Sequence, residues 1–343
     1  MMKKKRKLLT IIFICGVLIV CYAVWLGLYA KTPITSGMGE TITVDIPTGT
    51  GFIEVTDILS KAGLVKNKPL FYSLAGLKRA ARSIRAGEYE FSTSQTPLDL
   101  VNKLIRGEIK YYRVTIPEDI SLKEISAKLK EFKLVDEETF FELAYDKEFL
   151  SSLGIKAASI EGYLFPDTYF LTRSMSTRQI MRIMVDRFHH KITEAMFRGA
   201  ARKNLNPHQF VTFASLVGKE TGYSAEKPMI AAVFYNRLKI GMPLQSDPTA
   251  VYDLIDFDGV VLRSHYRRAS PYNTYVIKGL PPGPIASPGL DSFQAVLKPA
   301  EVDYLYFVSQ KDGTHFFSST LNQHNIATMR IRQIRNNGEK SRN

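Results

Sequence analysis

Glu220 combines a chemically active side chain with an apolar setting. The segment from Pro207 has apolar residues at helical spacing, and Glu220 lies about 20° from Phe213 and about 40° from Leu216 around that helix. Burial and the negative end of the helix dipole both disfavour a carboxylate there, so we expect a raised pKa. An acid still protonated near neutral pH can protonate the leaving oxygen of a glycosidic bond. The alternative is an ordinary glutamate with a solvated head.

A second chemistry is suggested by Ser224-Ala-Glu-Lys227, which directly follows this helix. It fits the Ser-x-x-Lys pattern of penicillin-binding serine acyltransferases. The companion patterns Ser-x-Asn and Lys-Thr-Gly are not convincingly present. We therefore favour a structural interpretation, in which Ser224 caps a helix and Lys227 lies on the surface.

Metal, thiol and nucleotide chemistry have little support. Both cysteines, Cys15 and Cys21, lie in the N-terminal apolar segment, so the remainder has no thiol for a disulfide, a metal or nucleophilic catalysis. The six histidines show no metal-binding spacing, and His189 and His190 are interpreted as surface residues. Phosphate-loop and dinucleotide fingerprints are absent from the sequence. We expect no metal and no cofactor.

Three further segments combine aromatic, acidic and amide side chains with turn-forming residues: Glu161–Tyr169, Leu244–Thr249 and Tyr272–Tyr275. The last leads into Gly279–Gly289, which has four prolines in eleven residues. Aromatic rings stack on sugars and polar groups fix sugar hydroxyls, so these segments suit sugar recognition. Proline restricts φ, so we expect Gly279–Gly289 to form a pre-shaped wall of a substrate groove. Each segment alone is also compatible with a structural turn.

The positive charge of the chain is concentrated at its ends. The 343 residues carry a formal net charge of +13, of which residues 1–31 hold +6 and residues 330–343 hold +4. The nearly neutral body makes a broad nucleic-acid-binding face unexpected. Hydrophobic residues make up 45% of the chain and charged residues 23%, which excludes a largely disordered protein.

The N-terminal charge flanks a candidate membrane span. Leu8 to Ala30 is a run of 23 residues without a charge, and as a helix it is about 35 Å long, enough to cross a bilayer. Five basic residues precede the run, which places the N-terminus in the cytoplasm and the bulk of the chain outside. A cleaved signal peptide is the alternative. The apolar core of a signal peptide usually has about 7–15 residues and ends at a small-x-small cleavage site. This run is longer and lacks such a site, so we favour a single-pass anchor.

An internal repeat follows the anchor. With a shift of 70 positions, Val44–Val65 aligns without a gap on Val114–Val135, and seven of 22 positions are identical. Each copy is predicted to be a strand, a turn at proline and an amphipathic helix. A strand over 86–91 and a helix over 97–105 lie between the copies. This strand–helix region loosely resembles LysM-type carbohydrate-binding modules.

The later part of the chain is predicted to be helix-rich with a few strands. Helical patterns cover 177–203, 207–220, 227–240 and 321–335, and a hairpin is centred on 311–313. We expect Thr96 to cap the helix over 97–105, and Asn206 to cap the helix over 207–220 with Pro207 in its first turn. The fold class is therefore α+β. We predict the following organisation: a cytoplasmic basic tail (1–7), a transmembrane helix (8–30), a stalk (31–41), a LysM-like region (42–155), a catalytic domain (156–336) and a polar tail (337–343).

The motifs of this later part together resemble one family. Ala214–Thr221, Val233–Leu238, Leu244–Thr249, Tyr272–Tyr275 and Gly279–Gly289 stand in the same order as in the YceG-like endolytic murein transglycosylases, the MltG family. The Glu161–Tyr169 stretch and the N-terminal anchor are similar too. The resemblance covers essentially the whole chain.

The resemblance implies a lytic transglycosylase of the bacterial inner membrane. Such an enzyme cleaves the β-1,4 bond between N-acetylmuramic acid and N-acetylglucosamine in nascent peptidoglycan and leaves 1,6-anhydro ends. The glutamate of Lys-Glu-Thr is the family's catalytic acid/base, here Glu220. Many members carry another glutamate where this chain has Gly218. The resemblance also suggests cell-wall synthases (penicillin-binding proteins) as partners. We predict these substrate-binding residues: Glu161, Tyr163, Gln245, Asp247, Tyr272, Asn273 and Thr274.

Two other functions remain open from the sequence. A muramidase would admit water and leave a reducing end, with a second carboxylate about 5–9 Å from the first. A tethered glycan-binding scaffold would use the repeated module without any chemistry. The mass of the product distinguishes all three, because an anhydro end is one water lighter than a reducing end and a scaffold forms no product.

Overall fold

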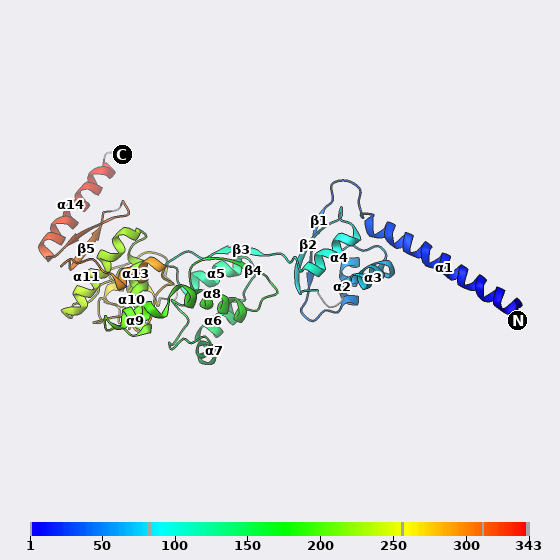
Figure 1. Cartoon of the computed structure of the whole chain (residues 1–343). Coiled ribbons are helices and arrows are strands. Elements are labelled where there is room, and N and C mark those ends of the chain that lie inside the picture. Colours follow the sequence, from blue (N-terminus) through cyan, green and yellow to red (C-terminus); the bar gives the residue numbers. More distant parts are fainter. Residues whose placement is uncertain (1, 81–83, 255–256, 311, 341–343) are drawn as a thin grey trace. The chain divides into compact units, whose positions relative to one another are not determined.

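The computed structural model describes residues 2–80, 84–254, 257–310 and 312–340 (Figure 1). By its internal contacts the chain divides into two units. Unit 1 comprises Met1–Tyr112 and Phe170–Met175, and unit 2 comprises Arg113–Tyr169 and Ser176–Asn343. The boundary falls within two short strands, β3 (Tyr112–Thr115) and β4 (Thr168–Leu171).

Unit 1 begins with the long apolar helix α1 (Met2–Lys31). The segment Lys4–Lys31 is long and apolar enough to cross a membrane. The prediction of one N-terminal apolar helix is confirmed, and its composition is compatible with a single-pass anchor. Most side chains between Leu8 and Leu28 are exposed, as expected for a helix that has no protein around it.

The rest of unit 1 packs three helices against a two-stranded antiparallel sheet. Val44 and Ile46 alternate with exposed residues along the first strand and enter the core, where they meet Tyr89 and Phe91 of the second. The strands pair from Thr41 with Ser92 to Ile46 with Gly87. The elements, in chain order, are β1 (Thr41–Ile46), α2 (Phe52–Lys61), α3 (Lys68–Leu77), β2 (Gly87–Ser92) and α4 (Pro97–Arg106).

The sequence explains where these helices start and stop. Thr96 and Asp99 form a reciprocal capping box at the start of α4, as the predicted cap at Thr96 requires. Gly107 ends the same helix with a φ of 62°, a conformation that costs glycine little. Asn67 caps α3 by accepting a hydrogen bond from the Leu70 amide.

The second copy of the repeat lies in unit 2. It contains β3 and α5 (Leu122–Glu131), which starts at a Ser121 capping box. The strand–turn–helix form predicted for both copies is therefore observed. Unit 2 begins at Arg113, whereas the sequence placed a domain start at 156, because the segment after β3 is bonded into unit 2: Ile116 N donates to Asp167 O at 2.9 Å.

Unit 2 is mostly helical, and its strands β5 and β6 form an antiparallel hairpin from Tyr306 opposite Ser318 to Ser309 opposite His315. The α+β class is confirmed. Besides α5, its elements are α6 (Glu137–Tyr145), α7 (Lys147–Ser152), α8 (Thr177–Lys191), α9 (Glu194–Ala201), α10 (Pro207–Glu220), α11 (Lys227–Lys239), α12 (Asp247–Val251), α13 (Leu290–Leu297), β5 (Tyr306–Ser309), β6 (His315–Ser318) and α14 (Leu321–Lys340).

The prediction of one continuous helix over 177–203 is wrong. The pattern is split into α8 and α9, because Ile192 has an extended backbone with φ −99° and ψ 96°. Ile192 is buried, so its side chain keeps the apolar spacing that made the pattern look continuous. The hairpin was predicted around 311–313, where Lys311 lies outside the described residues and Gly313 has a φ of 91°.

The helix α10 is the central element of unit 2. Every residue from Phe210 to Gly218 is buried, and the helix contacts α9, α11, α12 and α13 (Figure 1). Asn206 caps it by accepting from the Gln209 amide, and Pro207 occupies its first turn, as predicted. A helix that is apolar on all sides is fixed on all sides, so its last residue, Glu220, has a defined position.

We expect Asn206→Ala to destabilise the protein by about 1 kcal/mol, because the capping box of α10 is lost. Thermal unfolding of the detergent-solubilised chain, followed by circular dichroism, should show a decrease of about 2–4 °C in Tm. Thr193→Ala is the matched control, since Thr193 precedes α9 without a side-chain capping bond. Equal losses for both variants would contradict the importance of this cap.

Candidate active site

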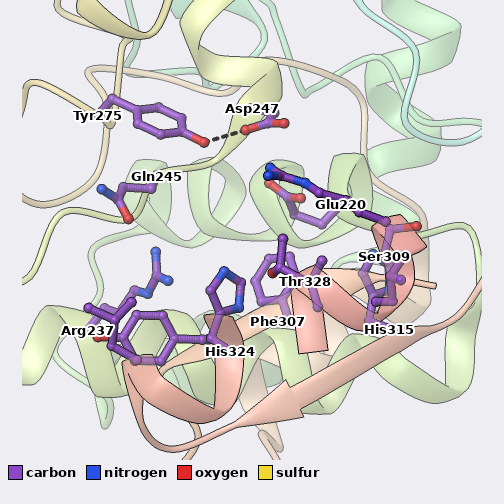
Figure 2. A pocket seen from close by; sticks show the side chains of 15 residues that line it. Glu220, Arg237, Gln245, Asp247, Tyr275, Phe307, Ser309, His315, His324 and Thr328 are labelled. Carbon is purple, nitrogen blue, oxygen red and sulfur yellow. Dashed lines mark hydrogen bonds between the residues drawn. The ribbon is translucent and has the colours of Figure 1, made fainter. Parts of the chain in front are cut away.

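Glu220 ends α10 at the edge of a pocket with a volume of about 540 Å³ (Figure 2). Its side chain is partly buried, and the chain turns to an extended conformation at Thr221, with φ −148°. The Ser246 hydroxyl donates a hydrogen bond to Glu220 Oε1. Glu220 is thus neither solvated nor sealed in the core: one side is held by protein and the other faces the cavity.

The segment Leu244–Thr249 places two polar side chains at this pocket. Gln245 adopts a left-handed backbone with φ 51°, which is unfavourable for a residue other than glycine. Gln245 and Asp247 line the cavity, while the buried Ser246 between them contacts Glu220. Along this turn, the side chains on either side of Ser246 face the cavity, and Ser246 itself faces Glu220.

Thr274 holds this turn from behind, and the adjacent Asn273 holds the neighbouring segment 265–268. Thr274 is fully buried, and its hydroxyl accepts from Ser246 N at 2.9 Å and bonds Thr249 Oγ1 at 2.8 Å. Asn273, also fully buried, donates to the carbonyls of His265 and Arg268 at 3.1 and 2.8 Å. These two predicted substrate-binding residues do not line the pocket, and their polar atoms are used inside the protein.

Asp247 is the second carboxylate of the pocket. Tyr275 donates a hydrogen bond to its Oδ1 (Figure 2), and Tyr266 donates to its Oδ2 at 3.2 Å. The two tyrosine rings pack together with centroids 4.5 Å apart. The two phenol donors fix the orientation of the Asp247 carboxyl, whose charge acts on Glu220.

The opposite wall comes from the C-terminal elements β5, β6 and α14 (Figure 2). Arg237 of α11 lies below it, donates to Leu305 O at 2.7 Å and Leu244 O at 2.6 Å, and stacks on Tyr306. His315 Nδ1 is 2.7 Å from Glu226 Oε2. The wall residues are Tyr306, Phe307, Val308, Ser309, His315, Leu321, His324, Thr328, Ile331 and Arg332.

The environment raises the pKa of Glu220 to about 7. Burial is the largest cause, because the charged form loses hydration. The Ser246 hydrogen bond lowers the pKa, the nearby charge of Asp247 raises it and Arg237 lowers it. A large fraction of Glu220 is therefore protonated near neutral pH, which a proton donor to a leaving oxygen requires.

The other predicted site residues lie apart from this cavity lining. Glu161 is buried, accepts from the Leu122 amide at 3.0 Å and from the Tyr252 hydroxyl at 2.9 Å, and has a pKa raised to about 7 by burial. It thereby joins the start of α5 to the end of α12. Tyr163 is buried and bonds His208 Nδ1 at 3.0 Å. Tyr272 packs on Tyr252, with ring centroids 4.8 Å apart.

The prediction that Gly279–Gly289 forms the groove wall is wrong for this pocket. Pro281 and 283–289 are buried, and Ile285 N donates to Ser215 Oγ of α10 at 3.1 Å. Gly289 has no room for a side chain, because an added Cβ would lie 2.1 Å from the Glu118 carboxyl. The restricted loop is a packing element against α10, and it supports the helix that carries Glu220.

The prediction of a surface position for Lys227 is also wrong. Lys227 is 2% exposed, and its ammonium group lies 2.7 Å from Asp291 and 3.6 Å from Asp119. Ser224 donates to Asp291 at 2.6 Å and belongs to a short 3-10 helix rather than capping α11. Both groups are engaged with acidic residues, so the structural interpretation of Ser-x-x-Lys stands.

Several pocket residues were not singled out by the sequence. His315 and His324 are far from Glu220 along the chain, and nothing in their local spacing indicates a site. Arg237 and Tyr275 lie in motifs that carry the family resemblance but were not predicted as site residues. The other three residues of the Tyr272–Tyr275 motif were predicted to bind substrate, so the motif itself could have indicated Tyr275. In the part of the chain that the structure describes, no group of three His, Cys, Asp or Glu residues is arranged to hold a metal.

The sequence profile of the YceG-like family matches residues 44–330. The chain is 33% identical over 322 residues to the endolytic murein transglycosylase of Bacillus subtilis, with 88% of each protein covered. It is 30% identical to the enzyme of the same name from Streptococcus pneumoniae D39, covering 85% of this chain but 58% of that protein.

A solved structure is also similar. The crystal structure of a YceG-like protein from Listeria monocytogenes superposes with a TM-score of 0.59 at 31% sequence identity, covering 83% of this chain and 98% of that one. The family profile and the relatives named endolytic murein transglycosylase identify a lytic transglycosylase, an enzyme that cleaves glycan chains. The chain belongs to the YceG-like family, as its motifs indicated.

The raised pKa of Glu220 predicts how its replacement changes stability with pH. An unfolded glutamate ionises near pH 4.5, whereas the folded carboxyl keeps its proton to about pH 7. Wild-type stability is therefore lost between these values, and Glu220→Gln should avoid that loss. We expect the variant's advantage in the free energy of unfolding to grow from pH 4.5 to 7 and then level off, at no more than about 3 kcal/mol, and the Tm difference should follow the same course.

The control is Glu131→Gln, at an exposed position. It should show no such trend in thermal unfolding monitored by circular dichroism across the same buffers. A Tm difference for Glu220→Gln that stays constant with pH would show that its carboxyl ionises normally in the folded protein.

Proposed function

We propose that this protein is a membrane-anchored lytic transglycosylase that cleaves the β-1,4 bond between N-acetylmuramic acid and N-acetylglucosamine within nascent peptidoglycan. The observation that carries the proposal is the Glu220 carboxyl, with a pKa near 7, at the edge of a 540 Å³ pocket that has aromatic and polar walls. Pockets of this size and lining suit sugar units. The relatives named endolytic murein transglycosylase support the substrate class.

Glu220 acts first as an acid and then as a base in this proposal. The protonated carboxyl donates its proton to O4 of the leaving sugar, and the C1–O4 bond of the muramic acid breaks. The resulting carboxylate accepts the proton of the C6 hydroxyl of that muramic acid. The C6 oxygen then bonds to C1 and closes a 1,6-anhydro ring. Atoms balance without added water, because the nucleophile belongs to the substrate.

Asp247 has a separate role in the same reaction. The transition state carries positive charge at C1 and the ring oxygen, and an ionised Asp247 in the same pocket stabilises that charge. Its two tyrosine donors fix it in place, so it need not reorganise during the reaction. The cavity-facing Gln245 is proposed to bind substrate directly, whereas Thr274 positions the turn that carries it.

A muramidase reaction is the second candidate. A second carboxylate lies in the pocket with Glu220, and Asp247 is thus available to orient a water that attacks C1. The two reactions differ in their products, one carrying an anhydro end and the other a reducing end.

The remaining features suggest a place at the cell membrane. We propose that α1 spans the inner membrane, with its basic N-terminus in the cytoplasm and both units outside. Cleavage of strands as they are made would terminate glycan polymerisation, which suggests peptidoglycan synthases as partners. The β1-α2-α3-β2 core of unit 1 is proposed to be a LysM-like glycan-binding module, supported by its paired strands and two intervening helices.

We expect Glu220→Gln to reduce cleavage of purified glycan strands by about 10³-fold or more, because the amide cannot donate the proton that the leaving oxygen needs. Mass spectrometry of the wild-type products should show anhydro ends, each one water lighter than a reducing end. Wild-type activity should also fall above pH 7 as Glu220 ionises. Full activity of Glu220→Gln would remove Glu220 from this role, and reducing ends would favour the muramidase.

Substrate contact by Gln245 and structural support by Asn273 should have different experimental effects. Gln245→Ala should raise KM about 3- to 10-fold and leave Tm unchanged, because it removes a cavity-facing hydrogen-bonding group. Asn273→Ala should lower stability by about 1–3 kcal/mol, because buried carbonyls lose their donor. Steady-state kinetics and thermal unfolding on both variants give the comparison. A raised KM for Asn273→Ala at unchanged Tm would assign it to substrate contact instead.

A further inference from the structure

The last third of α1 is part of the folded body of unit 1. Leu26 and Ala30 are 7% exposed and belong to the core of this unit. The Tyr22 hydroxyl lies 2.5 Å from Ser73 Oγ of α3. The segment expected to be a stalk is also bound, since Thr35 N donates to Thr93 O at 3.0 Å. Unit 1 is therefore held at the end of α1 rather than on a loose tether.

The helix α3 runs back along α1. Lys66, just before α3, donates to Ile34 O, which lies beyond the end of α1. Ser73, in the middle of α3, meets Tyr22, nine residues before that end. The next turn of α3, with Leu77, therefore lies still closer to the N-terminal part of α1. Figure 1 shows α3 beside the end of α1.

The length of α1 brings this turn to the bilayer. A hydrocarbon layer of about 30 Å takes about 20 helical residues. If Leu8 is its first residue, after the basic cluster, the layer ends near Gly27. Tyr22 then lies about 8 Å below that edge, yet it is already bonded to α3. Because the charged end of α3 cannot enter the hydrocarbon, α1 has to sit further out than this, which leaves the end of α3 at the level of the lipid headgroups.

The side chains at the end of α3 are of the kinds found at the level of the lipid headgroups. Leu77 is 74% exposed, and the following Lys78 and Arg79 are exposed too. An apolar side chain next to basic groups is the composition of interfacial segments, in which the apolar part enters the acyl boundary and the cations bind phosphate. Tyr22 and Trp25, 43% and 54% exposed, are the aromatic residues typical of membrane interfaces.

We propose that unit 1 is seated in the outer headgroup layer, with the end of α3, residues 76–79, bound to anionic phospholipid. Leu77 enters the acyl boundary, and Lys78 and Arg79 pair with lipid phosphates. The inference rests on the proposed anchor, and it adds a second, surface contact to it. It also explains why an apolar leucine is left uncovered beside two cations.

Depth measurements on the full-length protein in lipid nanodiscs test this. Cys15 and Cys21, the only cysteines, are replaced by alanine, and Leu77→Cys is labelled with an environment-sensitive fluorophore. Met38→Cys is the matched control, because Met38 is fully exposed and lies beyond Ile34, away from Leu77. In nanodiscs with about one quarter phosphatidylglycerol, spin-labelled lipids should quench the label at 77 at least about twofold more than the label at 38. Aqueous iodide should show the reverse.

A label in the middle of α1 separates this inference from the anchor itself. Cys15 lies on the N-terminal side of Tyr22, so in a chain in which only Cys21 is replaced, a label on Cys15 reports insertion of α1. A lipid-quenched label at 15 with an iodide-accessible label at 77 would overturn the docking alone. A label at 15 that the lipids do not quench would overturn both the anchor and the docking.

The charge contribution is tested by reversing it. Lys78→Glu with Arg79→Glu should at least halve the lipid quenching at 77 in nanodiscs that contain phosphatidylglycerol, because the cations no longer bind the anionic headgroups. Quenching that is unchanged by the charge reversal would overturn the phosphate contact. Both positions are exposed, so the fold of unit 1 should remain intact, as circular dichroism checks.

Discussion

The site depends on holding one carboxyl group at the boundary between the protein interior and a cavity. A glutamate in water would be ionised at neutral pH, and one sealed in the core would be unable to reach a substrate. α10 resolves this by being buried along its length and ending at the cavity, so that Glu220 leaves the core as the helix stops. The raised pKa of this carboxyl is a consequence of that placement.

Much of unit 2 holds α10, and therefore Glu220, in position. The proline-rich loop packs against α10 through Ser215, and the buried Lys227 joins Asp119 and Asp291 close to the same helix. Gly218 belongs to this arrangement, because a Cβ there would lie 1.8 Å from Asp119 Oδ1. Polar groups that looked like candidate chemistry in the sequence are used as supports. Buried polar groups need partners, and those partners fix neighbouring elements.

Unit 1 presents a different physical problem, the meeting of a folded body with a bilayer. An apolar helix of this length can be buried in lipid or in protein, and the two ends of α1 have different surroundings. Its exposed N-terminal part is suited to lipid, while Leu26 and Ala30 complete a protein core. In the proposed anchoring, the helix and the surface of α3 together set the height of unit 1 above the membrane.

Local patterns in the sequence determined the apolar helix, the caps at Thr96 and Asn206, the α+β class and the apolar stripe that contains Glu220. These depend on neighbours within one or two turns, which a sequence displays directly. The break between α8 and α9, the burial of Lys227 and the cavity wall from β5, β6 and α14 were decided by the tertiary structure. Whether a polar side chain faces a cavity or supports a turn depends on partners far away in the chain. Gln245 faces the cavity, whereas the hydroxyl of Thr274 is bonded to Ser246 and Thr249.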